Sequence, residues 1–138
     1  MAYPTELLTT VADCDLVLAE AAEERAELLF RQTQLQHLQL VGTGRATEKS
    51  AELTGALAEY NSLTTLLANM ADGTTKKRNQ REHKRLEYRI YVLSQEQTTG
   101  TSGIVAQFKR RYELNCLAQQ LLENATLTTE VEARRAAL

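Results

Sequence analysis

The chain has 138 residues, a formal net charge of −2 at pH 7 and a hydrophobic content of 43%. This length suits one domain with an ordinary core, and no apolar run approaches the ~18 residues needed to cross a bilayer. Tryptophan is absent, and the abundant Ala, Leu, Glu, Gln and Arg lose little entropy in a helix. We therefore expect an all-α protein that is not inserted in a membrane. We expect it in the cytoplasm, or within a virion or other particle assembled there.

Helix-breaking residues are few and divide the chain. The only proline is Pro4, and most glycines fall at 42–44, at 72–73 and at 100–103. We therefore predict four long helices and a short fifth helix, the last starting at a Thr129/Glu132 capping box. Their approximate ranges are 4–41, 45–71, 75–97, 103–124 and 129–138.

Apolar residues recur at helical spacing in each segment. The predicted core residues are Leu7, Val11, Cys14, Leu18, Ala21, Leu28 and Leu35 in the first helix; Leu53, Leu57, Tyr60, Leu63, Leu66, Leu67 and Met70 in the second; Leu86, Ile90 and Leu93 in the third; and Ile104, Phe108, Tyr112, Leu117, Leu121 and Leu122 in the fourth. The first helix is heptad-like, with Arg25 and Gln32 at intervening core positions.

Short turns between helices favour antiparallel hairpins. We therefore predict a single domain over 1–138, an elongated antiparallel bundle with hairpin one at 4–71, hairpin two at 75–124 and a tail at 125–138. Because the second helix is shorter than the first, the amino-terminal apolar residues, including Leu7 and Val11, need cover from hairpin two, the tail or another subunit.

The two cysteines, Cys14 and Cys116, lie far apart inside helical patterns, so we interpret both as reduced core residues. Nucleophile elbows, phosphate-binding glycine loops and zinc-ligand spacings are absent from the sequence. We therefore predict no catalytic residue, no metal and no cofactor. His37 has no partner that the sequence can identify.

Charge is unevenly distributed: residues 1–72 hold eleven acids and four bases, and residues 73–138 hold seven acids and twelve bases. In the acidic half, four carboxylates share one helical face, either as a solvated surface or as a docking site for a basic partner. They are Glu20, Glu23, Glu24 and Glu27.

In the basic half, a dense cationic run opens the third helix, with Arg89 beyond it and 109–111 on the next helix. It comprises Lys76, Lys77, Arg78, Arg81, Lys84 and Arg85. The run could contact a protein, including the glutamates of a second copy, could be solvated, or could neutralise nucleic-acid phosphates. The sequence pI near 5.7 argues against a dedicated nucleic-acid binder.

Within this run, the segment Arg78-Asn79-Gln80-Arg81-Glu82-His83 has the Arg-polar-x-x-x-His spacing and resembles HEPN-family ribonucleases, which are also small helical bundles. The resemblance implies metal-free RNA cleavage at a dimer interface, with His83 moving protons and Arg78 holding the phosphate. Arg85 stands where that family commonly has a tyrosine. His83 also lies on the line of Leu86, so the other interpretation is a histidine at the edge of the core.

The sequence therefore predicts a non-enzymatic helical adaptor or structural subunit of a multi-protein assembly that forms homo-oligomers. Opposite charges on one chain allow head-to-tail contacts between copies. The alternatives are a small subunit of a nucleic-acid-binding complex, which uses 76–89 and 109–111, and the HEPN-like ribonuclease.

Overall fold

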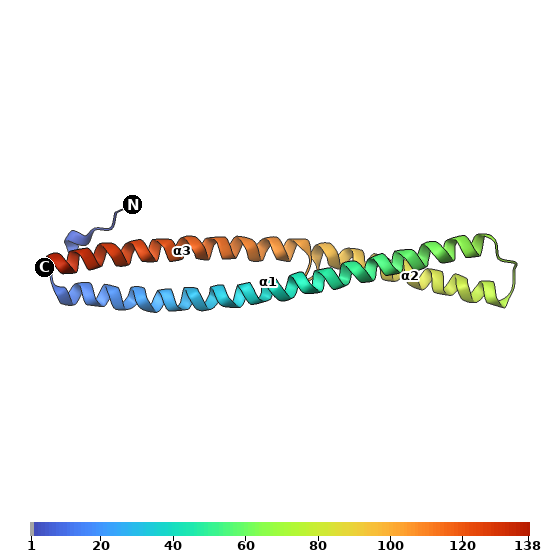
Figure 1. Ribbon diagram of the computed structural model, residues 1–138, viewed down its shortest axis with the longest axis horizontal. Helices are drawn as coiled ribbons and strands as arrows, with labels where there is room; N and C mark the ends of the chain where they lie inside the picture. The colour runs from blue at the N-terminus through green and yellow to red at the C-terminus, as the bar shows by residue number, and fades with distance from the viewer. Residues whose placement is uncertain (1) are drawn as a thin grey trace. The chain divides into compact units, whose positions relative to one another are not determined.

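The computed structural model describes residues 2–138 and shows three long α-helices after one short 3-10 helix (Figure 1). These are η1 (Thr5–Leu7), α1 (Val11–Ala68), α2 (Thr74–Thr99) and α3 (Ile104–Ala137). No strand occurs within residues 2–138. The all-α class is confirmed, but the four long helices are not.

The predicted break at 42–44 is wrong, because α1 passes through it as part of one 58-residue helix. A glycine allows a helix to end but does not force it to, and within the described chain neither Gly42 nor Gly44 has a positive φ. An interior glycine costs only about 1 kcal/mol relative to alanine, which a long helix with regularly spaced packing residues tolerates. Residues 11–41 and 45–68 therefore share one helix, and the predicted hairpin over 4–71 does not form.

The start of α1 is fixed by a reciprocal capping box rather than by Pro4. The Asp13 backbone N–H donates to Thr10 Oγ1 (3.1 Å), and the Thr10 N–H donates to Asp13 Oδ2 (3.2 Å). Hydrogen bonds from Thr10, that of its side chain first, and from Thr9 lower the pKa of the Asp13 carboxyl below its usual 3.8. Pro4 precedes η1 instead, so the predicted helix start near residue 4 is wrong.

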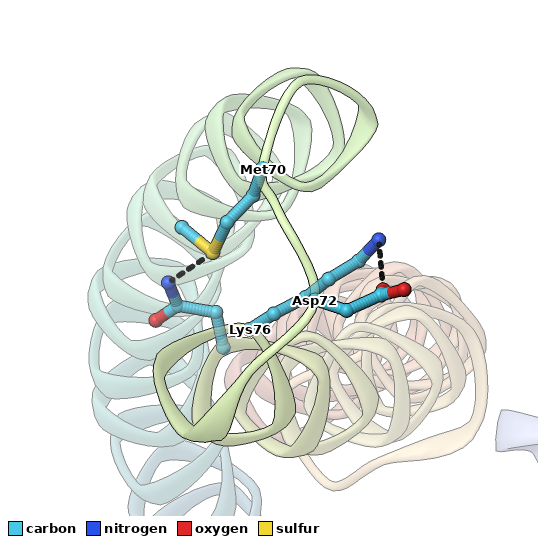
Figure 2. Close-up of polar contacts among 4 residues, drawn as sticks. Met70, Asp72 and Lys76 are labelled. Atoms are coloured by element: carbon cyan, nitrogen blue, oxygen red, sulfur yellow. Dashed lines mark hydrogen bonds and ion pairs between the residues drawn. The ribbon is translucent and has the colours of Figure 1, made fainter.

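The turn between α1 and α2 is held by two polar contacts (Figure 2). Asn79 Nδ2 donates to Met70 Sδ at 3.7 Å, and Lys76 Nζ pairs with Asp72 Oδ1 at 3.3 Å. Gly73, with φ 158° and ψ −176°, occupies a region that side chains rarely adopt. Here the prediction of a turn is confirmed.

The turn between α2 and α3 depends on close backbone approach. A Cβ at Gly100 would lie 2.7 Å from the Glu96 carbonyl oxygen, and one at Gly103 would lie 2.8 Å from the same oxygen. Beyond this turn α3 continues to Ala137, so the predicted separate helix at 129–138 is wrong. The Thr129 hydroxyl donates to the Ala125 carbonyl inside α3 instead of capping a new helix.

The chain forms two compact units, the first comprising residues up to Leu38 together with Arg110–Leu138 and the second Gln39–Lys109. In the first unit, residue numbers rise along α1 as those of the contacting residues in α3 fall, so the two segments run antiparallel. The contacts are Asp15 with Arg135 (2.6 Å), the Ala21 carbonyl with Asn124 Nδ2 (2.9 Å), and Arg31 with Glu113 (3.2 Å).

The core of the first unit is one narrow line of side chains. Its buried members are Cys14, Ala21 and Leu35 from α1, and Leu117, Asn124 and Val131 from α3. The separations are multiples of seven residues, the spacing that keeps one helix face toward a partner helix. The predicted core position of Cys14 is confirmed, since its exposure is 0%, whereas Cys116 is exposed, contrary to prediction.

The carboxyl-terminal segment and residues 3–8 cover the start of α1. Tyr3 Oη donates to Glu123 Oε1 (2.6 Å), the Tyr3 N–H donates to Glu130 Oε2 (3.1 Å), and Arg134 Nε donates to the Leu8 carbonyl (3.0 Å). The Glu123 hydrogen bond is the main cause that raises the pKa of Tyr3 to about 12. The tail therefore packs on this end and buries Cys14, but Leu7 and Val11, which were predicted to need cover, stay exposed. The predicted mismatch of helix lengths does not exist.

In the second unit, the end of α1 runs antiparallel to α2. Lys49 pairs with Glu96 (3.2 Å), Glu52 with Arg89 (3.7 Å), and Thr64 Oγ1 lies 2.8 Å from a nitrogen of the His83 ring. The buried cluster is Ala56, Leu86 and Leu93, packed by Leu53, Tyr60, Leu63 and Ile90. The predicted core of the third helix is therefore confirmed.

Candidate interaction surfaces

The helices keep most of their large apolar side chains outside the two cores. Among residues 2–138, eight hydrophobic residues are buried and seventeen large ones are exposed. The accessible surface is 10016 Å², against about 7,200 Å² expected for a folded monomer of this mass. Much of the apolar surface of the described chain is therefore exposed.

On α1, an outward apolar stripe lies behind the packed face of the first unit. Leu16 is 70% exposed and Phe30 is 65% exposed, with exposed Ala19 and Ala26 between them. The spacing of three, seven and four residues puts these side chains on one side of the helix. We call these four residues the α1 outer stripe.

Several residues predicted to form the core are exposed instead. Phe108 is 75% exposed and Tyr112 is 70% exposed, both on α3. The others are Leu7, Val11, Leu57, Leu66, Ile104 and Leu122. Helical spacing identified apolar stripes correctly, but these residues lie beside or behind the stripe that packs.

The four predicted glutamates are all exposed on α1 within the first unit. They are Glu20, Glu23, Glu24 and Glu27. No hydrogen bond or ion pair joins their carboxylates to any other described side chain, whereas Asp15 and Glu52 on the same helix pair with arginines. We call this set the acidic face.

The predicted cations divide into paired and unpaired groups. Lys76 pairs with Asp72, Arg85 with Glu82, and Arg89 with Glu52. Four others are exposed on α2, and no ion pair engages them within residues 2–138: Lys77, Arg78, Arg81 and Lys84. We call these four the basic face.

Two exposed tyrosines extend the basic face along α2. Tyr88 follows Arg81 by seven residues, and Tyr91 follows Lys84 by seven, so each pair lies on the same side of the helix. An open hollow next to this face is lined by Leu67, Lys77, Gln80, Arg81, His83, Lys84 and Glu87. The surface thus combines cationic groups with flat aromatic rings.

His83 lies at the edge of the core of the second unit, as one interpretation of the sequence predicted. Its ring stacks on Tyr60 with centroids 4.1 Å apart, and Nε2 lies 2.8 Å from Thr64 Oγ1. Arg78 is exposed. These contacts account for His83 as a packed side chain and lend no support to a ribonuclease site.

The remaining predicted contact residues are partly accessible. Leu7 is 73% exposed and Val11 is also exposed, although the segment around them packs on α3. In the second basic cluster, Lys109 and Arg111 are exposed while Arg110 is half-buried. Leu7 and Val11 therefore remain candidate contact residues.

Neither a metal site nor a membrane-spanning helix occurs in the part of the chain that the structure describes. No group of three or more His, Cys, Asp or Glu side chains that could hold a metal ion occurs within residues 2–138. Over the same residues, every helix is too short or too polar to cross a bilayer.

Comparisons with protein-family models, with curated proteins and with solved structures gave no match to this chain. Function must therefore be argued from the surfaces themselves. The sequence analysis identified both charged faces but missed the α1 outer stripe and the tyrosines beside the basic face. The signal was present, because Leu16 and Phe30 lie outside the heptad line of Cys14, Ala21, and Leu35.

Proposed function

We propose that this protein is a non-enzymatic structural subunit or adaptor that acts by helix-to-helix association. The observation that carries the proposal is the exposure of large apolar side chains on helices whose inner faces are already packed. Exposed apolar surface of this extent is typical of protein contact sites.

The energetic incentive for association is substantial. Fully burying a Leu or Phe side chain contributes about 1.5–3 kcal/mol, so Leu16 and Phe30 together contribute several kcal/mol before the cost of association. Their neighbours Ala19 and Ala26 are small, which allows a second helix to approach closely. Self-association through such faces is therefore our principal expectation.

Sedimentation equilibrium of the purified chain at micromolar concentration, in low and high salt, tests this function. We expect oligomers, and we expect Leu16→Gln with Phe30→Gln to weaken them while the helical circular dichroism is kept. Thr33→Gln, an exposed change on the same helix, is the matched control. A wild-type chain that is monomeric in both salts contradicts the proposal of self-assembly.

A second candidate function, nucleic-acid binding, is favoured by the basic face and its tyrosines. The second unit contains ten basic and seven acidic residues, so its charge is positive although the whole chain is acidic. Phosphate contacts would give an affinity that falls steeply with salt, and tyrosine rings could stack on exposed bases.

Fluorescence anisotropy with labelled single- and double-stranded oligonucleotides tests this second function. We expect binding at low salt that weakens steeply toward physiological salt. Alanine at the basic positions should flatten the salt dependence; these are Lys76, Lys77, Arg78, Arg81, Lys84 and Arg85. An absence of binding at low salt contradicts it.

A further inference from the structure

We propose that the acidic face on α1 of one copy docks on the basic face on α2 of a second copy. The inference rests on the proposed function and goes beyond it by naming the partner as the same chain and the contact as two specified faces. Each face is exposed, and each lies in a different compact unit.

The two faces match in spacing. Along α1, Leu16, Glu20, Glu23 and Glu27 are separated by four, three and four residues, and along α2, Lys77, Arg81, Lys84 and Tyr88 show the same separations. Both sets therefore lie along one side of a helix over about 16 Å. Two helices laid side by side can bring all four positions into register.

The register selects the antiparallel direction. When the helices run antiparallel, Glu23 meets Arg81, the two outer glutamates meet the two lysines, and Leu16 meets Tyr88. A parallel alignment gives two ion pairs only and places Leu16 beside Lys77. The antiparallel contact therefore satisfies three charge pairs and one apolar pair.

The charge balance of the units supports the same partner. The first unit holds eleven acidic and six basic residues, and the second holds seven acidic and ten basic residues. Copies therefore attract one another through unlike units and repel through like units, which selects the orientation of approach. Exposed ion pairs are screened by salt, so the contact should weaken as ionic strength rises.

The contact also provides partners for charges that have no ion pair within the described chain. Other cations of α2 are paired, as Arg85 is with Glu82 and Arg89 with Glu52. The two faces hold unpaired charges of opposite sign at matching spacing. A second copy supplies partners for three charges of each face at once and leaves Glu24 and Arg78 outside these pairs.

The test uses two neutralised variants of the full chain. One carries Glu20→Gln, Glu23→Gln and Glu27→Gln, and the other carries Lys77→Gln, Arg81→Gln and Lys84→Gln. Glutamine has nearly the helix propensity of the residues that it replaces, so circular dichroism should be unchanged. Each variant alone should self-associate about 10- to 100-fold more weakly than wild type in sedimentation equilibrium at low salt.

Mixing gives the decisive result. Each variant keeps the face that the other has lost, so an equimolar mixture should form a 1:1 heterodimer, detected by native mass spectrometry with one variant isotopically labelled. Exchanging the three glutamates and the three cations within one chain should restore wild-type association. As a matched control for the acidic-face variant, a chain with Glu48→Gln, Glu59→Gln and Glu132→Gln has the same change in net charge. These positions are exposed and outside the acidic face, so association should be unchanged.

The outcomes separate this inference from the proposed function. Wild-type association that the neutralised variants and high salt leave unchanged overturns the charged contact and keeps self-assembly through apolar faces. A wild-type chain that stays monomeric overturns both. Loss of association in the basic-face variant alone also overturns the inference, because the acidic face would then take no part.

Discussion

Replacing Gly44 with alanine tests the continuity of α1, on which the whole fold depends. Gly44 is an interior residue of the helix, its side-chain position is exposed, and a Cβ built there meets no atom within 4 Å. The substitution therefore adds no clash. It removes the backbone entropy that glycine loses on folding.

The expected stabilisation is about 1 kcal/mol, the difference in helix propensity between glycine and alanine. For a chain of this size it corresponds to a rise in melting temperature of about 3–5 °C. Gly55→Ala, eleven residues further along and equally open, should add a similar increment, because the two sites share no contact. The measurement is thermal and urea unfolding followed by circular dichroism.

Gly103→Ala is a control that should change the stability in the opposite direction. The new Cβ would lie 2.8 Å from the Glu96 carbonyl oxygen and 2.9 Å from Thr98 backbone atoms, so it should destabilise by about 1–3 kcal/mol. If Gly44→Ala lowers the melting temperature, the backbone there is not helical. A single α1 that runs without a break from Val11 to Ala68 would then be refuted.

Three further outcomes are expected from single contacts. The hydrogen bond to Glu123 raises the pKa of Tyr3 to about 12. This contact therefore stabilises the folded chain fully below pH 10, and the stabilisation is lost as the pH rises through about 12. Ultraviolet titration should show one tyrosine that ionises at this high pH, and Tyr3→Phe should remove that step. The lowered pKa of Asp13 means that its capping contribution is present above pH 3.8 and lost as pH falls through the folded value. Asp13→Asn should therefore lower the melting temperature at pH 7 but much less at pH 2, and equal effects at both would contradict the charge argument. Val131→Ala should cost about 2 kcal/mol in urea unfolding, because this 1%-exposed side chain closes the core of the first unit; an effect below 0.5 kcal/mol would mean that the tail does not pack there.

Much of the local structure could be predicted from the sequence. The heptad line through Cys14, Ala21 and Leu35, and the buried Leu86 and Leu93, were identified correctly because apolar residues at a period near 3.5 must share one face of a helix. The position of the acidic face followed from the same periodicity, and the basic face lies within the cationic run that the sequence shows directly.

The errors came from treating weak signals as decisive. The predicted helix stop at Gly42 and Gly44 is wrong because only a change in backbone conformation ends a helix, and neither glycine requires one. Thr10 and Asp13 were overlooked as a capping box in favour of Pro4. Thr129 was assigned a cap although its hydroxyl has an acceptor within its own helix.

The sequence by itself determined that the chain is helical, which residues repeat at heptad spacing and where the opposite charges gather, because these properties depend on neighbours three, four and seven positions away. The tertiary structure decided which apolar stripe is buried. Both Phe108 and Leu117 were predicted to be core residues, but Leu117 is buried, whereas Phe108, nine residues earlier and therefore on the opposite side of α3, is exposed. The reason is that burial depends on where a distant helix is placed, and the turns at 69–73 and 100–103 and the packing of α3 set that placement. Helical periodicity determines which residues share one face of a helix, but it does not determine which other segment packs on that face.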